Sequence, residues 1–193
     1  MSPLSALRAA ASPLFLLGAA HSGKSELAQQ LLAPDREALV LGTATVTDPA
    51  FARRLARLRA LRPGAWDTVE VGADLPAALA QALKRCDQVL VDSLNLWIAG
   101  LVIGSGDEAA PAAGEDGIEA RVYGLVSEVL AVTAKHPAAR VVFVSSETGA
   151  GPAPARVVER LYRRLTGESH QRVAAAAKTV PMVYAGVAVV IKG

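Results

Sequence analysis

The amino-acid sequence predicts one α/β domain with a mostly parallel β-sheet, helices on both faces and an antiparallel edge. Short Val, Leu and Ile runs alternate with longer Ala-, Leu- and Arg-rich segments of helical period, which is the pattern of a parallel sheet covered by helices. The step Ala185-Gly186 between two apolar runs is typical of a hairpin turn. A glycine-rich turn follows the first apolar run and precedes a helical segment, which places a functional loop at the carboxyl end of the first strand.

The same patterns give the expected elements in order. Each strand is a short β-branched or Leu-rich run, and each helix carries apolar residues at three- and four-residue spacing. The expected strands are 14–18, 38–42, 68–71, 88–92, 141–145, 181–184 and 187–191. The expected helices are 24–32, 49–59, 75–85, 94–102, 118–135, 153–165 and 169–178.

Composition excludes several classes of protein. The chain of 193 residues is 52% apolar but only 4% aromatic, so the core is expected to consist mainly of Ala, Val and Leu. The formal charge is +2 and no dense basic block occurs, which argues against nucleic acid as a partner. Cys86 is the single cysteine, so no internal disulfide and no cysteine-based zinc site can form. A reducing cytoplasm fits this composition.

Two segments are expected to lie outside the regular elements. Met1–Pro13 is interpreted as an N-terminal extension to a single domain over 14–193, and the sequence leaves open whether it packs. It is too short for a membrane span and is a poor signal peptide. Residues 104–116 are rich in Gly, Ala, Pro and acidic residues and are interpreted as a surface loop.

The glycine-rich turn is predicted to be a P-loop, with a chance Gly/Ser turn as the alternative. It matches the pattern GxxxxGK[ST], with an apolar strand before it and a helix after it. In such a loop the main-chain N–H groups point inward at a polyphosphate. The lysine bridges the terminal phosphates, and the serine hydroxyl binds Mg²⁺. The predicted nucleotide-binding residues of this loop are Gly18, Ala19, Ala20, His21, Ser22, Gly23, Lys24 and Ser25.

A carboxylate ends the fourth expected strand. Val89, Leu90 and Val91 precede Asp92, and in P-loop enzymes an acid at this place lies beside the metal. Asp92 is therefore predicted to be catalytic together with Lys24, and to hold Mg²⁺ with Ser25. An aspartate after a strand is also a common helix N-cap, so that alternative stays open.

Polar residues also follow the fifth expected strand. The loop 146–151 is glycine-rich and lies on the same sheet edge, where Glu147 is available to a metal-bound water, a ribose or a substrate amide. The alternative is a purely structural turn, in which the glycines serve only the backbone geometry of the loop. Arg160, Arg163 and Arg164 follow on a helix, and one of the first two is a candidate phosphate ligand because guanidinium grips oxyanions in a fork.

Together these motifs resemble one known family. The P-loop, the run Val89–Trp97, the loop 146–151 with Pro154, and the tail Arg160–Ala176 are similar in order and spacing to the bifunctional adenosylcobinamide kinase / adenosylcobinamide-phosphate guanylyltransferases of cobalamin biosynthesis. The resemblance extends from Leu14 to the C-terminus.

This resemblance implies a RecA-like P-loop fold, commonly assembled as a homotrimer. It implies phosphorylation of the aminopropanol hydroxyl of adenosylcobinamide by ATP or GTP, and then transfer of GMP from GTP to the new phosphate. The second step proceeds in the family through a guanylylated histidine, which divides one displacement into two. The Thr-x-Glu element of the family corresponds to Thr68 and Glu70, so Glu70, Glu147 and Arg163 join the expected nucleotide-binding residues.

The position of the nucleophilic histidine departs from the family pattern. Alignment on Arg62-Pro63 and Trp66 places Leu58 at that position, and leucine has no nucleophile. The three histidines of the chain are His21, His136 and His170, and none lies between residues 34 and 135. Our hypothesis is that the kinase machinery is present, and that guanylylation is lost, altered or carried by a different residue.

Two other functions stay open at this point. The first is a P-loop kinase or NTPase that acts on another small molecule, which would turn over nucleotide without responding to a corrinoid. The second is a nucleotide-binding regulator without catalysis, which would bind GTP without turnover. Corrinoid as the substrate and a homo-oligomer both rest on the resemblance alone.

Overall fold

The computed structural model of the chain describes residues 3–44, 48–103 and 114–193. Its centre is a seven-stranded sheet with the order β3-β2-β4-β5-β1-β6-β7. All neighbouring pairs are parallel except β6 and β7, which form an antiparallel hairpin, so the predicted sheet is confirmed. The strands are β1 (Leu14–Gly18), β2 (Ala38–Gly42), β3 (Trp66–Glu70), β4 (Gln88–Asp92), β5 (Arg140–Val144), β6 (Val180–Tyr184) and β7 (Val187–Lys192).

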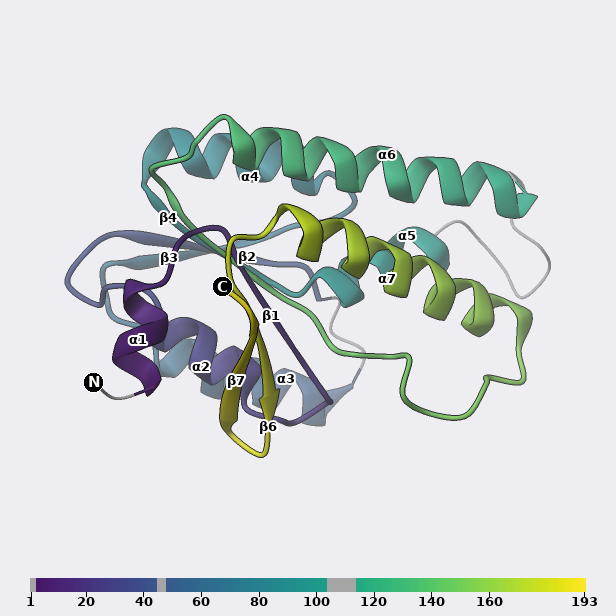
Figure 1. The fold of residues 1–193 in the computed structure, drawn as a ribbon, viewed down its shortest axis with the longest axis horizontal. Coiled ribbons are helices and arrows are strands. Elements are labelled where there is room, and N and C mark those ends of the chain that lie inside the picture. The colour runs from purple at the N-terminus through teal and green to yellow at the C-terminus, as the bar shows by residue number, and fades with distance from the viewer. Residues whose placement is uncertain (1–2, 45–47, 104–113) are drawn as a thin grey trace.

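Helices cover both faces of this sheet (Figure 1). Four of them, α4 to α7, lie on one side, and α1, α2 and α3 lie on the other. The larger core is built on the first side around Phe15, Val91 and Phe143, and the smaller core on the second side around Leu14, Leu16 and Val142. The helices are α1 (Pro3–Ala9), α2 (Lys24–Gln30), α3 (Pro49–Ala60), α4 (Leu75–Arg85), α5 (Leu94–Ile103), α6 (Gly114–Ala134) and α7 (Val157–Ala176).

Aspartate caps fix the start of two helices. The Asp48 side chain accepts a hydrogen bond from the Phe51 N–H at 2.9 Å before α3, and Asp74 accepts one from the Ala77 N–H at 3.2 Å before α4. Each cap satisfies an N–H group that the helix itself leaves unpaired. A proline in the first turn of each helix has the backbone angle a helix needs.

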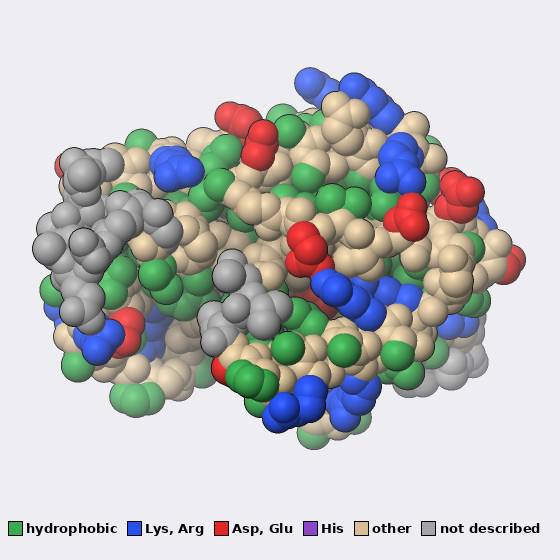
Figure 2. All heavy atoms as spheres, turned by 180° about the vertical axis from the view of Figure 1, so that it is seen from behind, with side chains coloured by type: hydrophobic (Ala, Val, Ile, Leu, Met, Phe, Trp, Pro, Cys, Tyr) green, Lys and Arg blue, Asp and Glu red, His purple; other side chains and the backbone are tan. Residues whose placement is uncertain are grey.

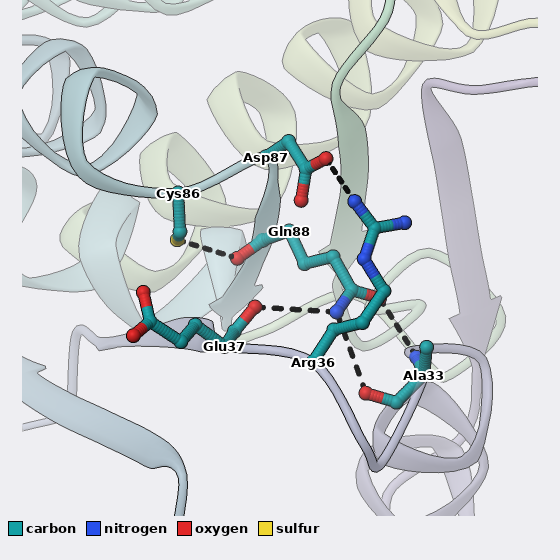
Figure 3. Close-up of polar contacts among 6 residues, drawn as sticks. All are labelled: Ala33, Arg36, Glu37, Cys86, Asp87 and Gln88. Carbon is teal, nitrogen blue, oxygen red and sulfur yellow. Dashed lines mark hydrogen bonds and ion pairs between the residues drawn. The ribbon is translucent and has the colours of Figure 1, made fainter.

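A buried glutamine joins the α2–β2 connection to the start of β4 (Figure 3). Gln88 accepts a hydrogen bond from the Ala33 N–H at 2.7 Å, and its amide donates to the carbonyls of Ala33 and Glu37 at 3.4 and 3.2 Å. Arg36 pairs with Asp87 beside it. These bonds pair three backbone groups of the α2–β2 connection with one buried side chain, so they fix how β4 enters the sheet.

The N-terminal extension packs against the domain. Leu7 on α1 is 3% exposed and belongs to the smaller core. The guanidinium of Arg140 donates to the carbonyls of Leu7 and Ala10, and the Thr179 hydroxyl donates to the Ala11 carbonyl at 3.0 Å. The extension therefore covers the amino-terminal edge of the sheet.

The prediction of two helices over 153–165 and 169–178 is wrong, because α7 is continuous from Val157 to Ala176. Gly167 in its middle costs about 1 kcal/mol relative to alanine, but Leu165, Ser169 and His170 on either side of it are buried. Tertiary packing therefore overrides the local weakness. Of the loop expected over 104–116, residues 104–113 lie outside the described residues, and 114–116 form the first turn of α6.

Within the described ranges, no helix is long and apolar enough to cross a membrane. On the face shown in Figure 2, Lys and Arg side chains are interspersed with Asp and Glu rather than gathered into one basic surface. That distribution agrees with the absence of a dense basic block in the sequence.

Replacing Leu7 with alanine is expected to lower the free energy of unfolding by about 2–3 kcal/mol, because it removes a buried side chain and leaves a cavity. Urea unfolding followed by circular dichroism measures the change. The matched control is Leu61→Ala, since Leu61 is 62% exposed, and it is expected to cost less than about 0.5 kcal/mol. Equal effects of the two changes would show that α1 does not pack in solution.

Candidate phosphate-binding site

The loop between β1 and α2 has the backbone that the P-loop pattern predicts. Gly18 and Gly23 have φ angles of +153° and +90°, and His21 has +58°. Such left-handed conformations are adopted most readily by glycine. Gly23 is the N-cap of α2 and provides no side-chain cap, so the N–H groups of the first turn are left for an anion.

The lysine of the loop is folded over it. Lys24 Nζ donates to the Ala19 carbonyl at 2.6 Å and to Ser22 Oγ at 3.4 Å, and the side chain is 6% exposed. Burial lowers the pKa of Lys24, and the negative charge of Asp92 opposes that effect. The amine therefore lies where it meets the oxygens of a phosphate held by the loop.

Ser25 and Asp92 are brought together as the sequence predicts. Ser25 Oγ donates to Asp92 Oδ1 at 3.3 Å, although β4 and β1 are separated in the sheet by β5. Burial raises the pKa of Asp92, while the Ser25 hydrogen bond and then the charges of Arg62, Arg54 and Lys24 act in the opposite direction. A hydroxyl and a carboxylate are oxygen ligands of the kind that Mg²⁺ prefers.

Protein side chains alone do not form a full metal cage here. The described part of the chain contains no group of three or more His, Cys, Asp or Glu residues that could hold an ion. Mg²⁺ in phosphoryl-transfer sites commonly takes one or two protein ligands and completes its shell with phosphate oxygens and water. Ser25 and Asp92 fit that mode of binding.

Two arginines of the site were missed by the sequence reasoning. The positive charges of Arg54 on α3 and of Arg62 just after it lower the pKa of Asp92. Arg62 donates to Thr68 Oγ1, and its Nε is buried without a hydrogen-bond partner among the described residues. Their place in the sequence could have indicated them, because α3 follows β2, and the carboxyl end of β2 lies on the same sheet edge as the P-loop.

Glu70 lies far along this edge from the loop. It ends β3 and pairs with Arg59, with 54% of its side chain exposed. Three strands separate β3 from β1, and strand spacings of about 4.8 Å put the two roughly 19 Å apart. A Cβ on Gly42 would lie 3.3 Å from Glu70 Oε2, and Gly42 is the register partner of Asp92. The structure therefore places Glu70 apart from Lys24 but on the part of the sheet edge where Asp92 lies.

The loop after β5 lies directly against the P-loop. The Glu147 N–H donates to the Gly18 carbonyl at 2.9 Å, and its carboxylate accepts from the Gly149 N–H at 2.5 Å. Arg163 donates to the carbonyls of Gly149 and Pro152. In this structure Arg163 therefore braces the loop that carries Glu147. Arg160 similarly donates to the carbonyls of Pro154 and Ala155.

A buried polar group supports this loop from behind. Ser145 Oγ and His170 Nε2 are 2.7 Å apart, and the Asn95 amide oxygen accepts from the Ser146 N–H at 2.9 Å. Burial lowers the pKa of His170 from 6.5 to about 4, with a small opposing effect from Glu147. His170 is therefore neutral at physiological pH and positions α7 against the end of β5.

The position aligned with the family nucleophile is enclosed. Leu58 on α3 is 3% exposed, and its carbonyl accepts a hydrogen bond from Gln29 of α2 at 3.3 Å. His21 is an exposed residue of the P-loop itself. His136 is beside a hollow lined by Ser12, Leu130 and Lys178, at the amino-terminal edge of the sheet, opposite the P-loop.

Comparisons with known proteins agree with this geometry. The family model described as cobinamide kinase / cobinamide phosphate guanyltransferase matches residues 14–191. The bifunctional adenosylcobalamin biosynthesis protein CobP of Pseudomonas aeruginosa is 32% identical, with 92% of this chain and 96% of the relative covered. CobU of Salmonella typhimurium, described in the same words, is 28% identical, with 93% and 99% covered.

A solved structure supports the fold alone. It belongs to a prototypical ATPase from the type III secretion system of pathogenic bacteria, with a TM-score of 0.53 and 11% identity. The match covers 96% of this chain and 60% of the ATPase chain.

The neutral, buried state of His170 predicts a pH dependence. Between pH 6.5 and about 4 the unfolded chain binds a proton at His170 that the folded chain does not, so stability falls as the pH drops through this window. The loss is expected to be about 2–3 kcal/mol. Between these pH values, the free energy of unfolding of His170→Asn is expected to fall by about 2–3 kcal/mol less than that of the parent chain. Urea unfolding of the parent chain and of His170→Asn at about pH 4.5 and about pH 7 measures this difference. An identical change of stability with pH in the two proteins would contradict the prediction.

Proposed function

Since the chain belongs to the cobinamide kinase / cobinamide phosphate guanyltransferase family, we propose that it phosphorylates the hydroxyl group of adenosylcobinamide with ATP or GTP. The observation that carries the proposal is the convergence of Lys24, Ser25 and Asp92 at the mouth of the P-loop. These are the residue types that phosphoryl transfer requires, because its catalysis consists mainly of positioning and charge neutralisation.

Each group has a defined part in this reaction. The N–H groups of the P-loop and of the first turn of α2 bind the phosphate oxygens, the Ser22 N–H after it leaves the Ala19 carbonyl. Lys24 leaves the Ala19 carbonyl and donates to the terminal phosphates, where charge-assisted bonds are stronger than bonds to a neutral carbonyl. Ser25 and Asp92 hold Mg²⁺, which supplies positive charge to the phosphate oxygens when bound. Arg54 and Arg62 add positive charge beside Asp92.

The second activity of the family is proposed to be lost at its usual position. Leu58 on α3 has no nucleophilic atom and is buried, and its carbonyl accepts a hydrogen bond from Gln29 of α2. Covalent guanylyl transfer needs a nucleophile that reaches the α-phosphate of GTP. We therefore propose a chain that makes adenosylcobinamide phosphate and does not form a guanylylated enzyme at residue 58.

The homotrimer implied by the family resemblance is retained as part of the proposal, and analytical ultracentrifugation tests it.

Two labelled nucleotides separate the two activities. With Mg²⁺ and adenosylcobinamide, γ-³²P-ATP is expected to label the corrinoid, and α-³²P-GTP is expected to label neither the protein nor the corrinoid. Label from α-³²P-GTP on the protein would show that another residue replaces the histidine. Nucleotide hydrolysis without labelled corrinoid would favour another substrate, and nucleotide binding without turnover would favour a regulator.

Replacing Lys24 with alanine is expected to lower kcat for corrinoid phosphorylation at least about a hundred-fold, because one preorganised donor to the transferring phosphate is lost. Initial rates with saturating ATP measure the effect. The matched control is Lys84→Ala, since Lys84 is an exposed lysine at the other end of the strands, in the last turn of α4. A parent-like rate in Lys24→Ala would remove the P-loop from the mechanism.

A further inference from the structure

We propose that the outer end of the β6–β7 hairpin is a shelf for the nucleobase, on which the side chains of Tyr184 and Val187 receive the base of the nucleotide bound by the P-loop. The inference rests on the phosphate-binding role of that loop, which is part of the proposed function. It adds the place of the base, for which the sequence motifs give no residue.

The turn of the hairpin is in direct contact with the P-loop. The Gly186 N–H donates to the Ser22 carbonyl at 2.9 Å, and a Cβ on Gly23 would lie 3.5 Å from the Gly186 Cα. Ala185 and Gly186 both have positive φ angles, +48° and +81°, as in the two-residue turns that close tight hairpins. In Figure 1 the hairpin extends from the sheet to a tip at the bottom of the view. A ligand that leaves the P-loop on this side therefore meets the hairpin.

The sheet order gives the direction in which a nucleotide lies. Strands β5 and β4 are on one side of β1, and β6 and β7 are on the other. Asp92 ends β4 and accepts from Ser25, so the metal-bound terminal phosphates belong on the β4 side. The nucleoside is at the other end of the phosphate chain and consequently leaves toward β6 and β7.

The hairpin presents an apolar, partly aromatic surface at that place. Tyr184 and Val187 are directly opposite each other in the antiparallel register, so their side chains share one face of the hairpin. They are 59% and 64% exposed, and Val189 further along the same face is 55% exposed. The neighbouring residue Val183 points to the opposite face of the hairpin and is fully buried. The surface is thus open to a flat ring that stacks on Tyr184.

This chemistry does not distinguish between bases. Stacking on an aromatic ring accepts any base, because every base has a π-face. Tyr184, Val187 and Val189 carry only one polar group, the tyrosine hydroxyl. The shelf is therefore expected to bind adenine and guanine about equally, so that ATP and GTP are both accepted.

Isothermal titration calorimetry with Mg²⁺ tests the shelf by comparing ATP, GTP and inorganic tripolyphosphate, which has no nucleoside. Tyr184→Ala is expected to weaken ATP and GTP binding about ten-fold and to leave tripolyphosphate binding unchanged. Tyr184→Phe is expected to keep the parent affinity, because the ring remains. The matched control is Val190→Ala, since Val190 is 50% exposed on the other face of the hairpin, and it is expected to change neither affinity.

The outcomes separate this inference from the proposed function. Parent-like ATP and GTP affinity in Tyr184→Ala would overturn the shelf, and a simultaneous change in sedimentation would assign the surface to a contact between copies of the chain. Equal weakening of ATP and tripolyphosphate would also overturn it, because the turn would then act through the P-loop. A parent chain that binds ATP through Tyr184 but never phosphorylates a corrinoid would refute the proposed substrate and leave the shelf in place.

Discussion

The close packing of the P-loop between its neighbours is the constraint on which the candidate site depends. A Cβ on Gly18 would lie 2.3 Å from the Val183 carbonyl oxygen of β6, a distance that no side chain tolerates. The Gly18 carbonyl accepts from Glu147 on one side, and the Ser22 carbonyl accepts from Gly186 on the other. Adjacent segments therefore hold the Gly18 and Ser22 carbonyls, and within the loop the Ser22 N–H donates to the Ala19 carbonyl at 3.3 Å. The sheet order that brings β5 and β6 to either side of β1 is consequently also what shapes the phosphate cradle.

At the same edge of the sheet, burial and neighbouring groups have opposite effects on the ionisation of Asp92. Burial disfavours the ionised form of Asp92, and Ser25, Arg62, Arg54 and Lys24 favour it. Lys24 donates to a carbonyl and a hydroxyl of its own loop. An anion offers it stronger charge-assisted bonds at almost the same place. The proposed binding of a polyphosphate therefore requires Lys24 to exchange its bond with the Ala19 carbonyl for a phosphate oxygen.

Local patterns in the sequence predicted most of the fold, and the family comparison confirms the resemblance that its motifs implied. The strands were predictable because each is a short buried apolar run, and the P-loop because its glycines have a backbone role that few sequences satisfy. Tertiary relations were not predictable. The continuity of α7 through Gly167 depends on the burial of Leu165 and His170, and the distance of Glu70 from the loop depends on the strand order. Likewise, the use of Arg163 to brace its own loop follows from the path of residues 149–152.

The two activities of the family make separate physical demands, and we propose that this chain meets only those of the first. Phosphoryl transfer needs charge and position, both of which are provided at the ends of β1 and β4. Covalent guanylyl transfer needs one further atom, a nucleophile with access to the α-phosphate. Position 58 lies on α3, is buried, and its carbonyl accepts a hydrogen bond from Gln29. Lys24 and Ser25 bond to their own loop and to Asp92, so the proposed kinase reaction requires no nucleophile at position 58. On this proposal, a domain of this kind can carry out the first reaction of the two-step enzyme without the atom that the second reaction requires.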